Sequence, residues 1–525
     1  MQELWRRQAW SGLLADAAAT ALAVAVGGVA LIAVIVREPR LYRPVLAGAL
    51  VFNLVVLARR WPRAAIATTL MLLPFLALLR RLLISRAGWS GNDPLLLVAP
   101  LLAIYLIGSA YVLAKRPVSR DWLTKLVIGL AIFSGFEAFN PTSHSGLLAG
   151  VAGLLFLAVP LLWFLLGQHF GTRRLIQLLL AGALVLAVIV AGYGLWQTRI
   201  RPAVPSWDRS WIQVTGYEAL YVGGQNVATE VRPFSTFSSN AEYAAYLSSG
   251  IIIALGFALR RRVLGLVAVP LLAYALFYAG GRSVIVLTLV GIVTLFALTA
   301  RRLQRGIVVF VAGIAIAIGV GSVFGSSLDR AASTSGDAIT QRNVTGILNP
   351  FSSTSSTLPY HFTNLVNGIA SGVTHPLGEG DAATNLASSR LSGTATLVTD
   401  DDISDVFVSL GILGGVAYLA VIVLVFRRVF SAYARSKDML LLVIGGLLVV
   451  NLEHWLQGGY YAIAPLFWFV VGWACRGTPV KANRQLGESF RGPPIAGAHP
   501  PSEREPTRTG EVSGGRAVTR PSNLL

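Results

Sequence analysis

The sequence has few of the residues on which soluble and secreted proteins depend. Its single cysteine, Cys475, excludes an internal disulfide and any cysteine-based metal cage. Only 13% of the 525 residues are charged, whereas 54% are apolar, and this balance excludes a soluble globular domain. Lysine occurs only at positions 115, 125, 437 and 481, so nearly all of the positive charge is arginine.

Apolar segments about as long as a bilayer is thick recur along the chain. Such segments are helical in lipid, because every backbone polar group must find its partner within the segment. The sequence predicts an all-α, polytopic transmembrane helical bundle of about 12 to 14 spans. The candidate spans cover residues 17–36, 44–58, 64–79, 94–114, 126–139, 147–167, 175–197, 241–259, 263–279, 283–300, 306–324, 403–426, 439–456 and 460–474.

Arginine-containing clusters occupy alternate connections between these spans, which is typical of cytoplasmic loops. The clusters lie at residues 115–125, 173–174, 260–262, 301–305 and 427–437. The intervening connections 140–146 and 457–459 contain no Lys or Arg. This alternation predicts that both termini are cytoplasmic and that two long polar segments, 198–240 and 325–402, are extracytoplasmic. Arg37, Arg40 and Arg43 break the rule, because the same alternation places them outside.

The sequence predicts that the chain is divided into three regions. Residues 1–125 form N-terminal transmembrane helices, and residues 126–475 form a membrane core that includes both external segments. Residues 476–525 are rich in Pro, Gly, Ser and Arg and have too few apolar side chains to offset the entropy of ordering, which predicts a disordered cytoplasmic tail. The net charge of +19 is spread over many connections, so nucleic-acid binding, which needs a basic patch, is not expected.

Ionisable residues gather near the predicted outer ends of the spans. A charge at the centre of a span costs about 3 kcal/mol, so each one is a functional hypothesis. A residue near a helix end can also extend into the headgroup region and pair there. Six residues share this depth, which favours a polar cavity open to the outside: Glu137, Glu242, Arg282, Asp405, Glu453 and His454.

Two arginines suggest a site for phosphate. Arg282 follows Gly280 and Gly281, which allow close backbone approach, and a guanidinium is shaped for bidentate contact with phosphate oxygens. The alternative is an arginine at the membrane interface that binds a phospholipid headgroup. Arg232, which precedes Pro233, supplies a second cation on the same predicted side. Two converging cations suit a diphosphate.

Four motifs lie in order between residues 230 and 430. Residues 232–247 (RPFSTFSSNAEYAAYL) are similar to R-x-x-G-x-F-x-x-x-N followed by a span, and residues 280–283 (GGRS) to an S-R pair that opens a span. Residues 375–380 (HPLGEG) are similar to P-x-G-x-G, and residues 400–414 (DDDISDVFVSLGILG) to a loop-to-span transition ending in G-x-x-G. Together they resemble the O-antigen ligase and polysaccharide polymerase superfamily. Ser235 replaces the first motif's glycine, and Gly281 replaces the serine before arginine.

The resemblance implies a multi-pass protein of the bacterial plasma membrane that is a metal-independent glycosyltransferase without a cofactor. Its donor would be an undecaprenyl-diphosphate-linked glycan, whose diphosphate Arg232 and Arg282 would bind and stabilise as the leaving group. The partners would be this lipid-linked glycan, membrane lipids and other polysaccharide assembly proteins. The same motifs contribute further expected substrate contacts at Asn240, Glu242, Ser283, Gly378 and Gly380.

The general base is left open by the sequence. Ligases of this superfamily have a histidine where this chain has Asp400, and a nearby carboxylate could accept the proton of the acceptor hydroxyl instead. The candidates are Asp400, Asp401, Asp402 and Asp405, with His361 as a reserve base and substrate contact. The alternative for each aspartate is a solvated acidic helix start favoured by the helix dipole. Consecutive aspartates also suggest a divalent metal, but adjacent side chains do not converge, so none is expected.

Three functions are compatible with these patterns. The leading one is a polymerase that joins lipid-linked repeat units into an extracellular polysaccharide, because the ligase histidine is absent. The second is ligase-like transfer of a lipid-linked glycan to a lipid or cell-wall acceptor. The third, of another class, is a lipid-linked oligosaccharide flippase or transporter, which should show internal repeats and broken helices at the bilayer midplane. No repeat is evident in the sequence.

Overall fold

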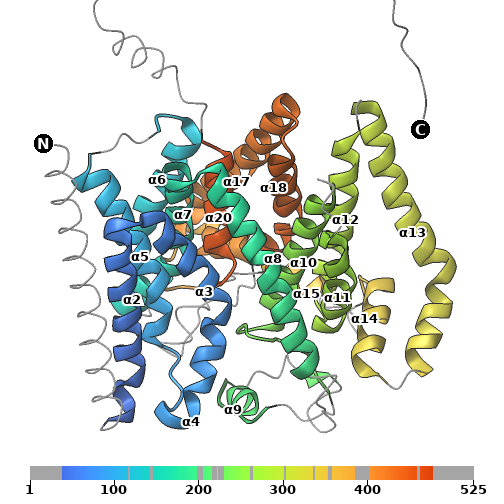
Figure 1. The fold of residues 1–525 in the computed structure, drawn as a ribbon, viewed down its shortest axis with the longest axis horizontal. Coiled ribbons are helices and arrows are strands. Elements are labelled where there is room, and N and C mark those ends of the chain that lie inside the picture. Colours follow the sequence, from blue (N-terminus) through green and yellow to red (C-terminus); the bar gives the residue numbers. More distant parts are fainter. Residues whose placement is uncertain are drawn as a thin grey trace, which may run out of the picture. The chain divides into compact units, whose positions relative to one another are not determined.

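The computed structural model describes residues 38–115, 119–141, 146–197, 205–215, 221–222, 230–259, 264–300, 303–334, 337–352, 358–384, 401–457 and 461–476 (Figure 1). Helices dominate these residues, and the strands among them are two residues each, β1 (Tyr221–Val222) antiparallel to β2 (Glu230–Val231). The all-α bundle predicted from the sequence is confirmed at this level. The predicted first span, 17–36, and residues 477–525 lie outside the described ranges.

The helices follow the predicted spans closely. They are η1 (Pro39–Leu41), α2 (Tyr42–Arg60), α3 (Pro62–Leu82), α4 (Ile84–Ala87), η2 (Pro94–Leu97), α5 (Val98–Ile107), η3 (Gly108–Leu113), α6 (Trp122–Glu137), α7 (Gly146–Phe170), α8 (Arg173–Leu195), α9 (Ser206–Thr215), α10 (Asn240–Leu259), α11 (Leu264–Ala279), α12 (Arg282–Thr299), α13 (Leu303–Thr334), α14 (Ala338–Leu348), α15 (Leu358–Thr374), α17 (Asp402–Ser436), α18 (Met439–Val450), α19 (Leu452–Gln457) and α20 (Ala464–Ala474).

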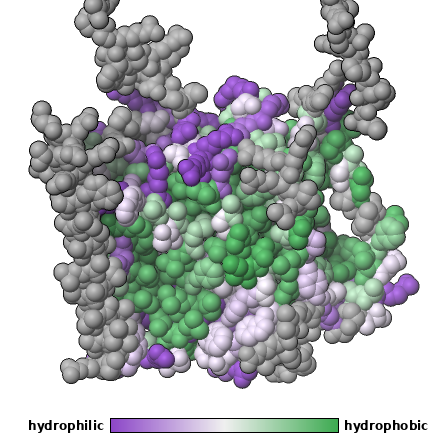
Figure 2. Space-filling model, viewed as in Figure 1, coloured by the Kyte–Doolittle hydropathy of each residue, from purple (hydrophilic) through white to green (hydrophobic). Residues whose placement is uncertain are grey.

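Apolar length identifies the chain as a membrane protein. Within the described ranges, eight helical segments are long and apolar enough to cross a membrane. They are Pro39–Arg60, Pro62–Leu82, Pro94–Leu113, Gly146–Phe170, Arg173–Leu195, Asn240–Leu259, Arg282–Thr299 and Asp402–Ser436. Shorter apolar helices cover Gly265–Ala279, Gln304–Ile316, Met439–Val450 and Ala464–Ala474. Figure 2 shows apolar side chains across the middle of the visible face, with hydrophilic ones toward its upper and lower edges.

Helix α10 lies at the centre of the packing. Within its apolar window, 78% of the residues are buried, the highest share among the eight segments. It contacts α8, α11, α12 and α18. Its first turn, which begins at Asn240, therefore reaches the end of the bundle with neighbours on several sides.

The helices differ from the predicted spans at three places. Helix α13 continues to Thr334, past the predicted span end at residue 324, because a helix can extend beyond its apolar part into polar sequence. The segment labelled α17 consists of two helical parts that join at a kink at Gly411 (φ 63°, ψ −167°), and its second part continues to Ser436, beyond the predicted span end at residue 426. The predicted span 439–456 is divided at Asn451 into α18 and α19.

Different contacts stabilise each end of the bundle. At one end, Nη2 of Arg428 lies 3.0 Å from Oδ1 of Asp121, and Arg173 forms an ion pair with Asp438. These pairs join connections that share the predicted cytoplasmic side. At the other end, α9 of the first polar segment packs on α3 and α4, and α14 of the second contacts β1 of the first. Both polar segments therefore meet at one end, as the predicted alternation requires.

The exceptional Arg43 is a buried residue rather than a loop charge. Its side chain is 3% exposed and forms an ion pair with Asp93. Asp93 also accepts from Arg80, with Nε 3.2 Å from Oδ2. The positive-inside rule counts charges in loops, so a guanidinium that is paired inside the bundle does not contradict it.

Candidate functional site

A buried polar network fixes the backbone that follows Arg232. Arg81 of α3 donates from Nη1 to the Phe237 carbonyl at 2.8 Å and from Nη2 to the Ser235 carbonyl. Its Nε lies 3.0 Å from Oδ1 of Asp208, which comes from α9. Gln197 completes the network, because it donates to Asp208 at 2.7 Å and accepts from the Ser235 N–H at 3.0 Å. Burial raises the pKa of Asp208, while the charge of Arg81 acts in the opposite direction.

Ser235 stands at the position where the first motif has glycine, and its backbone has a conformation that favours glycine. Its φ is +52°, in the left-handed region that favours glycine. The serine hydroxyl donates to the Val190 carbonyl at 2.6 Å, and the residue is fully buried. The chain therefore keeps a backbone shape suited to the motif's glycine, although the residue itself differs.

The side chain of Arg232 packs against the turn between α11 and α12, which immediately precedes Arg282. A Cβ added to Gly280, whose φ is +77°, would lie 2.9 Å from Cδ of Arg232. Arg282 begins α12 two residues later. Asn240, at the start of α10, secures this turn by donating from Nδ2 to the Ala279 carbonyl at 3.0 Å. The aliphatic part of the Arg232 side chain thus lies over Gly280, in the turn that leads to Arg282.

A third arginine joins this pair. A Cβ at Gly346 of α14 would overlap Nη1 of Arg282, so the Arg282 guanidinium lies directly on this helix. Arg342 is one turn earlier on α14, and its positive charge acts on Arg282. Asn343 anchors α14 by donating to the Phe277 carbonyl at 2.6 Å. We call Arg232, Arg282 and Arg342 the arginine cluster. Arg342 belongs to no motif, and sequence reasoning missed it.

Glu242 and Ser283 complete the residues of the first two motifs. Glu242 is 3% exposed, and its carboxylate accepts from the Ala462 N–H at 2.7 Å and from the Ser238 hydroxyl at 2.9 Å. It therefore ties the first turn of α10 to the segment before α20. Ser283 is half-buried beside Arg282 in the first turn of α12.

The glycines of the last two motifs interlock two backbones. Three of them have positive φ: Gly378 (94°), Gly380 (89°) and Gly411 (63°). The kink at Gly411 leaves carbonyls of α17 available, and the Glu379 and Gly380 N–H groups donate to Val408 and Ser409 at 2.8 and 3.1 Å. A Cβ at Gly378 would overlap the Ser409 carbonyl. The structure thus places Gly378 and Gly380 in backbone packing against α17.

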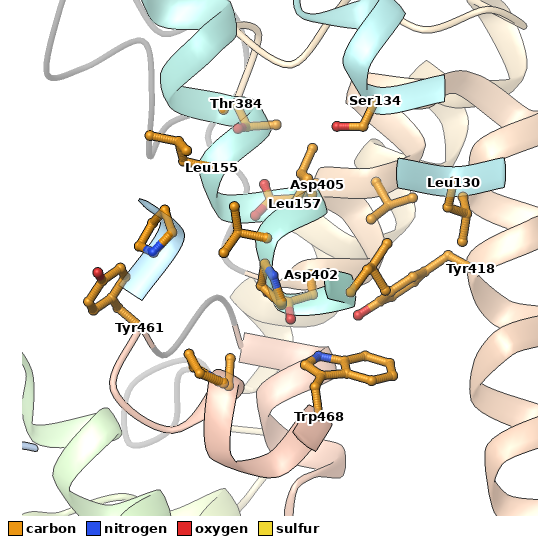
Figure 3. Close-up of a pocket in the computed structure, with 18 of the residues that line it drawn as sticks. Leu130, Ser134, Leu155, Leu157, Thr384, Asp402, Asp405, Tyr418, Tyr461 and Trp468 are labelled. Atoms are coloured by element: carbon orange, nitrogen blue, oxygen red, sulfur yellow. The ribbon is translucent and has the colours of Figure 1, made fainter. Parts of the chain in front are cut away.

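Two of the candidate aspartates line a cavity (Figure 3). Asp402 and Asp405 are three residues apart on the first turn of α17 and lie on one face. The cavity measures about 960 Å³ including space open to solvent, and its walls are mostly apolar side chains of α5, α6, α7 and α20. His454 of α19 also lines it, with Nε2 3.2 Å from Oδ2 of Asp402. This pair was not predicted, although the sequence placed His454 near the outer end of its span and Asp402 at the end of the second polar segment, directly before the next predicted span.

The other base candidates have different surroundings. Asp401 is the N-cap of α17, and its carboxylate accepts from the Ser404 N–H and hydroxyl, each at 2.7 Å. Asp400 lies outside the described residues. His361 is half-buried in α15, with its ring 5.7 Å from that of Tyr360, and it is not among the cavity-lining residues.

The arginine cluster and the cavity are adjoining groups rather than one pocket. No member of the arginine cluster lines the cavity. Both groups border the first turn of α10, because Asn240 bonds to the turn before Arg282 and Glu242 interacts electrostatically with His454. Within the described part of the chain, no group of three or more His, Cys, Asp or Glu residues could hold a metal ion.

Asp381 adds a titratable contact between the second polar segment and α6. Its Oδ2 accepts from the Ser134 hydroxyl at 2.6 Å, and Ser134 lines the cavity. Burial raises the pKa of Asp381 to about 8, the Ser134 hydrogen bond opposes this shift, and the charge of Glu137 adds to it. The carboxyl is therefore largely protonated at neutral pH.

This raised pKa predicts a pH-dependent stability. Between the ordinary carboxyl value of 3.8 and about 8, the folded state binds more protons than the unfolded state, so stability falls as pH rises through this window. Asp381→Asn mimics the protonated form. We expect the variant to gain stability relative to the unmodified protein as pH rises from about 4 to 8. Thermal unfolding in detergent at several pH values measures the difference, and parallel pH profiles would contradict it.

Comparison with known proteins does not assign this chain to a family. No protein-family model matches this chain, and no curated protein matches it in sequence. The fold and the apolar helices define an all-α integral membrane protein. The arginine cluster, the cavity and the motif resemblance are therefore the features of this chain that bear on its function.

Proposed function

We propose that this protein is a membrane glycosyltransferase that polymerises undecaprenyl-diphosphate-linked repeat units into an extracellular polysaccharide. The observation that carries the proposal is that Arg232 packs on the turn from which Arg282 begins, although the two residues come from separate motifs. Guanidinium groups bind phosphate oxygens in bidentate geometry, and two of them match the two phosphates of the donor.

The reaction needs charge stabilisation and a proton acceptor. A hydroxyl of the acceptor sugar attacks the anomeric carbon of the donor glycan, and the bond from that carbon to the diphosphate oxygen breaks. The electron pair stays on the diphosphate, where Arg232 and Arg282 stabilise the developing charge. The hydroxyl proton passes to a carboxylate, and Asp402 and Asp405 are the candidates that line a cavity.

The sidedness of the bundle supports a lipid-linked donor. Both long polar segments meet at the end opposite the pairs Arg428–Asp121 and Arg173–Asp438. We assign the end with these pairs to the cytoplasm because it contains the arginine-rich connections. The arginine cluster then faces outward, away from cytoplasmic nucleotide sugars, and a lipid-linked glycan is the donor available there.

A transporter is the second candidate, and the cavity favours it. Carboxylates and a histidine inside a membrane bundle are typical of proton relays. Asp402, Asp405 and His454 line a largely apolar cavity that the arginine cluster does not reach. A proton-coupled flippase for the same lipid-linked glycan would use these groups without breaking a covalent bond.

One assay distinguishes these functions. Purified protein in liposomes is given undecaprenyl-diphosphate-linked repeat units, and the lipid and glycan products are separated by size. Polymerisation yields a ladder of glycans together with free undecaprenyl diphosphate. Ligase-like transfer yields single transfers that depend on an added lipid or cell-wall acceptor. A transporter leaves the substrate chemically intact while moving it between leaflets, and that result would overturn the proposal.

A further inference from the structure

Arg342 is a half-buried cation on α14, a helix that none of the four motifs includes. Among the residues that the structure describes, none forms a hydrogen bond or ion pair with its guanidinium. Burial lowers the pKa of Arg342, but an arginine remains charged at neutral pH. A partly desolvated charge without a protein partner is costly, and an anionic ligand would offset this cost.

The position of Arg342 relative to Arg282 follows from helix geometry. Residues four apart on a helix lie on the same face, so Arg342 and Gly346 are neighbours along α14. The guanidinium of Arg282 lies against Gly346, at a place where a Cβ would overlap it. The two like charges are therefore held side by side by the fold, and repulsion between them acts on Arg282.

The anchoring of α14 makes this arrangement specific. Asn343 donates to the Phe277 carbonyl at 2.6 Å, so α14 is fastened to the end of α11 just before the turn that carries Arg282. Asp337 caps the helix start by accepting from the Ile339 and Thr340 N–H groups at 3.2 and 3.4 Å. The second polar segment thus delivers a third cation to the turn that Arg232 crosses.

We propose that Arg342 is a third phosphate-binding residue of the donor site, and that it makes the arginine cluster selective for a polyprenyl diphosphate over a polyprenyl monophosphate. This inference rests on the proposed function. Three guanidinium groups match the greater charge and the additional oxygens of a diphosphate. A monophosphate needs fewer contacts, so loss of Arg342 weakens its binding less.

The test measures binding rather than turnover. Fluorescent polyprenyl diphosphate and polyprenyl monophosphate are titrated into the purified protein in detergent. We expect Arg342→Ala to weaken diphosphate binding about tenfold, as for the loss of one charge-assisted contact. Monophosphate binding should change by less than about twofold, so the preference between the two lipids collapses.

A second variant tests the geometry without removing a charge. Gly346→Ala adds a Cβ where the Arg282 guanidinium lies, and the end of that side chain can shift without backbone movement. Alanine also has the higher helix propensity, so the helix itself is not weakened. We expect the same loss of diphosphate preference. Gly129→Ala, where a Cβ meets nothing within 4 Å, is the matched control and should bind both lipids normally.

The outcomes separate this inference from the proposed function. If the unmodified protein prefers the diphosphate and Arg342→Ala keeps that preference, the role of Arg342 is wrong and the proposed function stands. If the unmodified protein binds neither lipid, the proposed function fails with it. If Arg342→Ala weakens both lipids equally, the residue supplies general attraction to phosphate, and the claimed selectivity is wrong.

Discussion

Replacing Arg282 by alanine should lower the release of undecaprenyl diphosphate by about 10² to 10³ fold, the range observed when one donor to a developing negative charge is removed. The guanidinium lies on α14 next to Arg342 and beside the turn that Arg232 crosses. Arg282 is the only positively charged residue in this turn, residues 280–282. Initial rates of diphosphate release, at saturating donor, measure the effect.

Two further variants make the Arg282 result interpretable. Arg282→Lys keeps the charge but loses bidentate geometry, so we expect partial activity. Arg330→Ala removes an exposed arginine of α13 from the second polar segment, 325–402, and should leave the rate unchanged. Elution as a single folded species in detergent shows that each variant is intact. A folded Arg282→Ala protein with normal turnover would remove the diphosphate assignment.

Replacing Asp402 by asparagine should lower the rate of transfer by about 10² to 10⁴ fold, as expected for the loss of a general base. Donor binding should persist, because Asp402 lines the cavity and the arginine cluster does not. Asparagine keeps the size and one oxygen of the side chain, so contact with His454 can remain. The measurements are single-turnover transfer rates and, separately, the affinity for the fluorescent polyprenyl diphosphate.

Asp401→Asn is the matched control for Asp402. Its carboxylate caps α17 through Ser404, so the change should act on stability, by up to about 1 kcal/mol, with little effect on the rate per folded molecule. Asp405→Asn tests the second carboxylate of the cavity. Normal transfer rates in both the Asp402 and Asp405 variants would exclude the cavity carboxylates as the base and favour the proton-relay role of a transporter.

The sequence predicted the helices well because the membrane imposes one strong rule. Apolar segments must be helical in lipid, so the spans that became α2, α3, α7, α8 and α10 were visible from hydropathy alone. Hydropathy does not show where a helix continues into polar sequence, and for that reason the extension of α13 and the kink of α17 were missed. The kink depends on a backbone partner from residues 376–380, which no local pattern reveals.

The candidate site was only partly visible for the same reason. Arg232 and Arg282 stood out because each lies in a motif with glycine or proline, and the structure brings both to one turn. Arg342 had no local signal, because its position depends on how α14 docks on α11 through Asn343. Asp401 and Asp402 are adjacent residues of the same type, yet Asp401 caps a helix and Asp402 lines a cavity.

The sequence by itself determined that the chain is a helical membrane protein, because apolar length and the cost of unpaired backbone groups in lipid permit no other fold for these segments. It also placed two arginines in similar loop-to-helix contexts. Only the tertiary structure decided which charged side chains meet, since distances between segments far apart in the chain depend on helix packing. That packing joined a third arginine to the first two and placed Asp402 and Asp405 in an adjoining cavity.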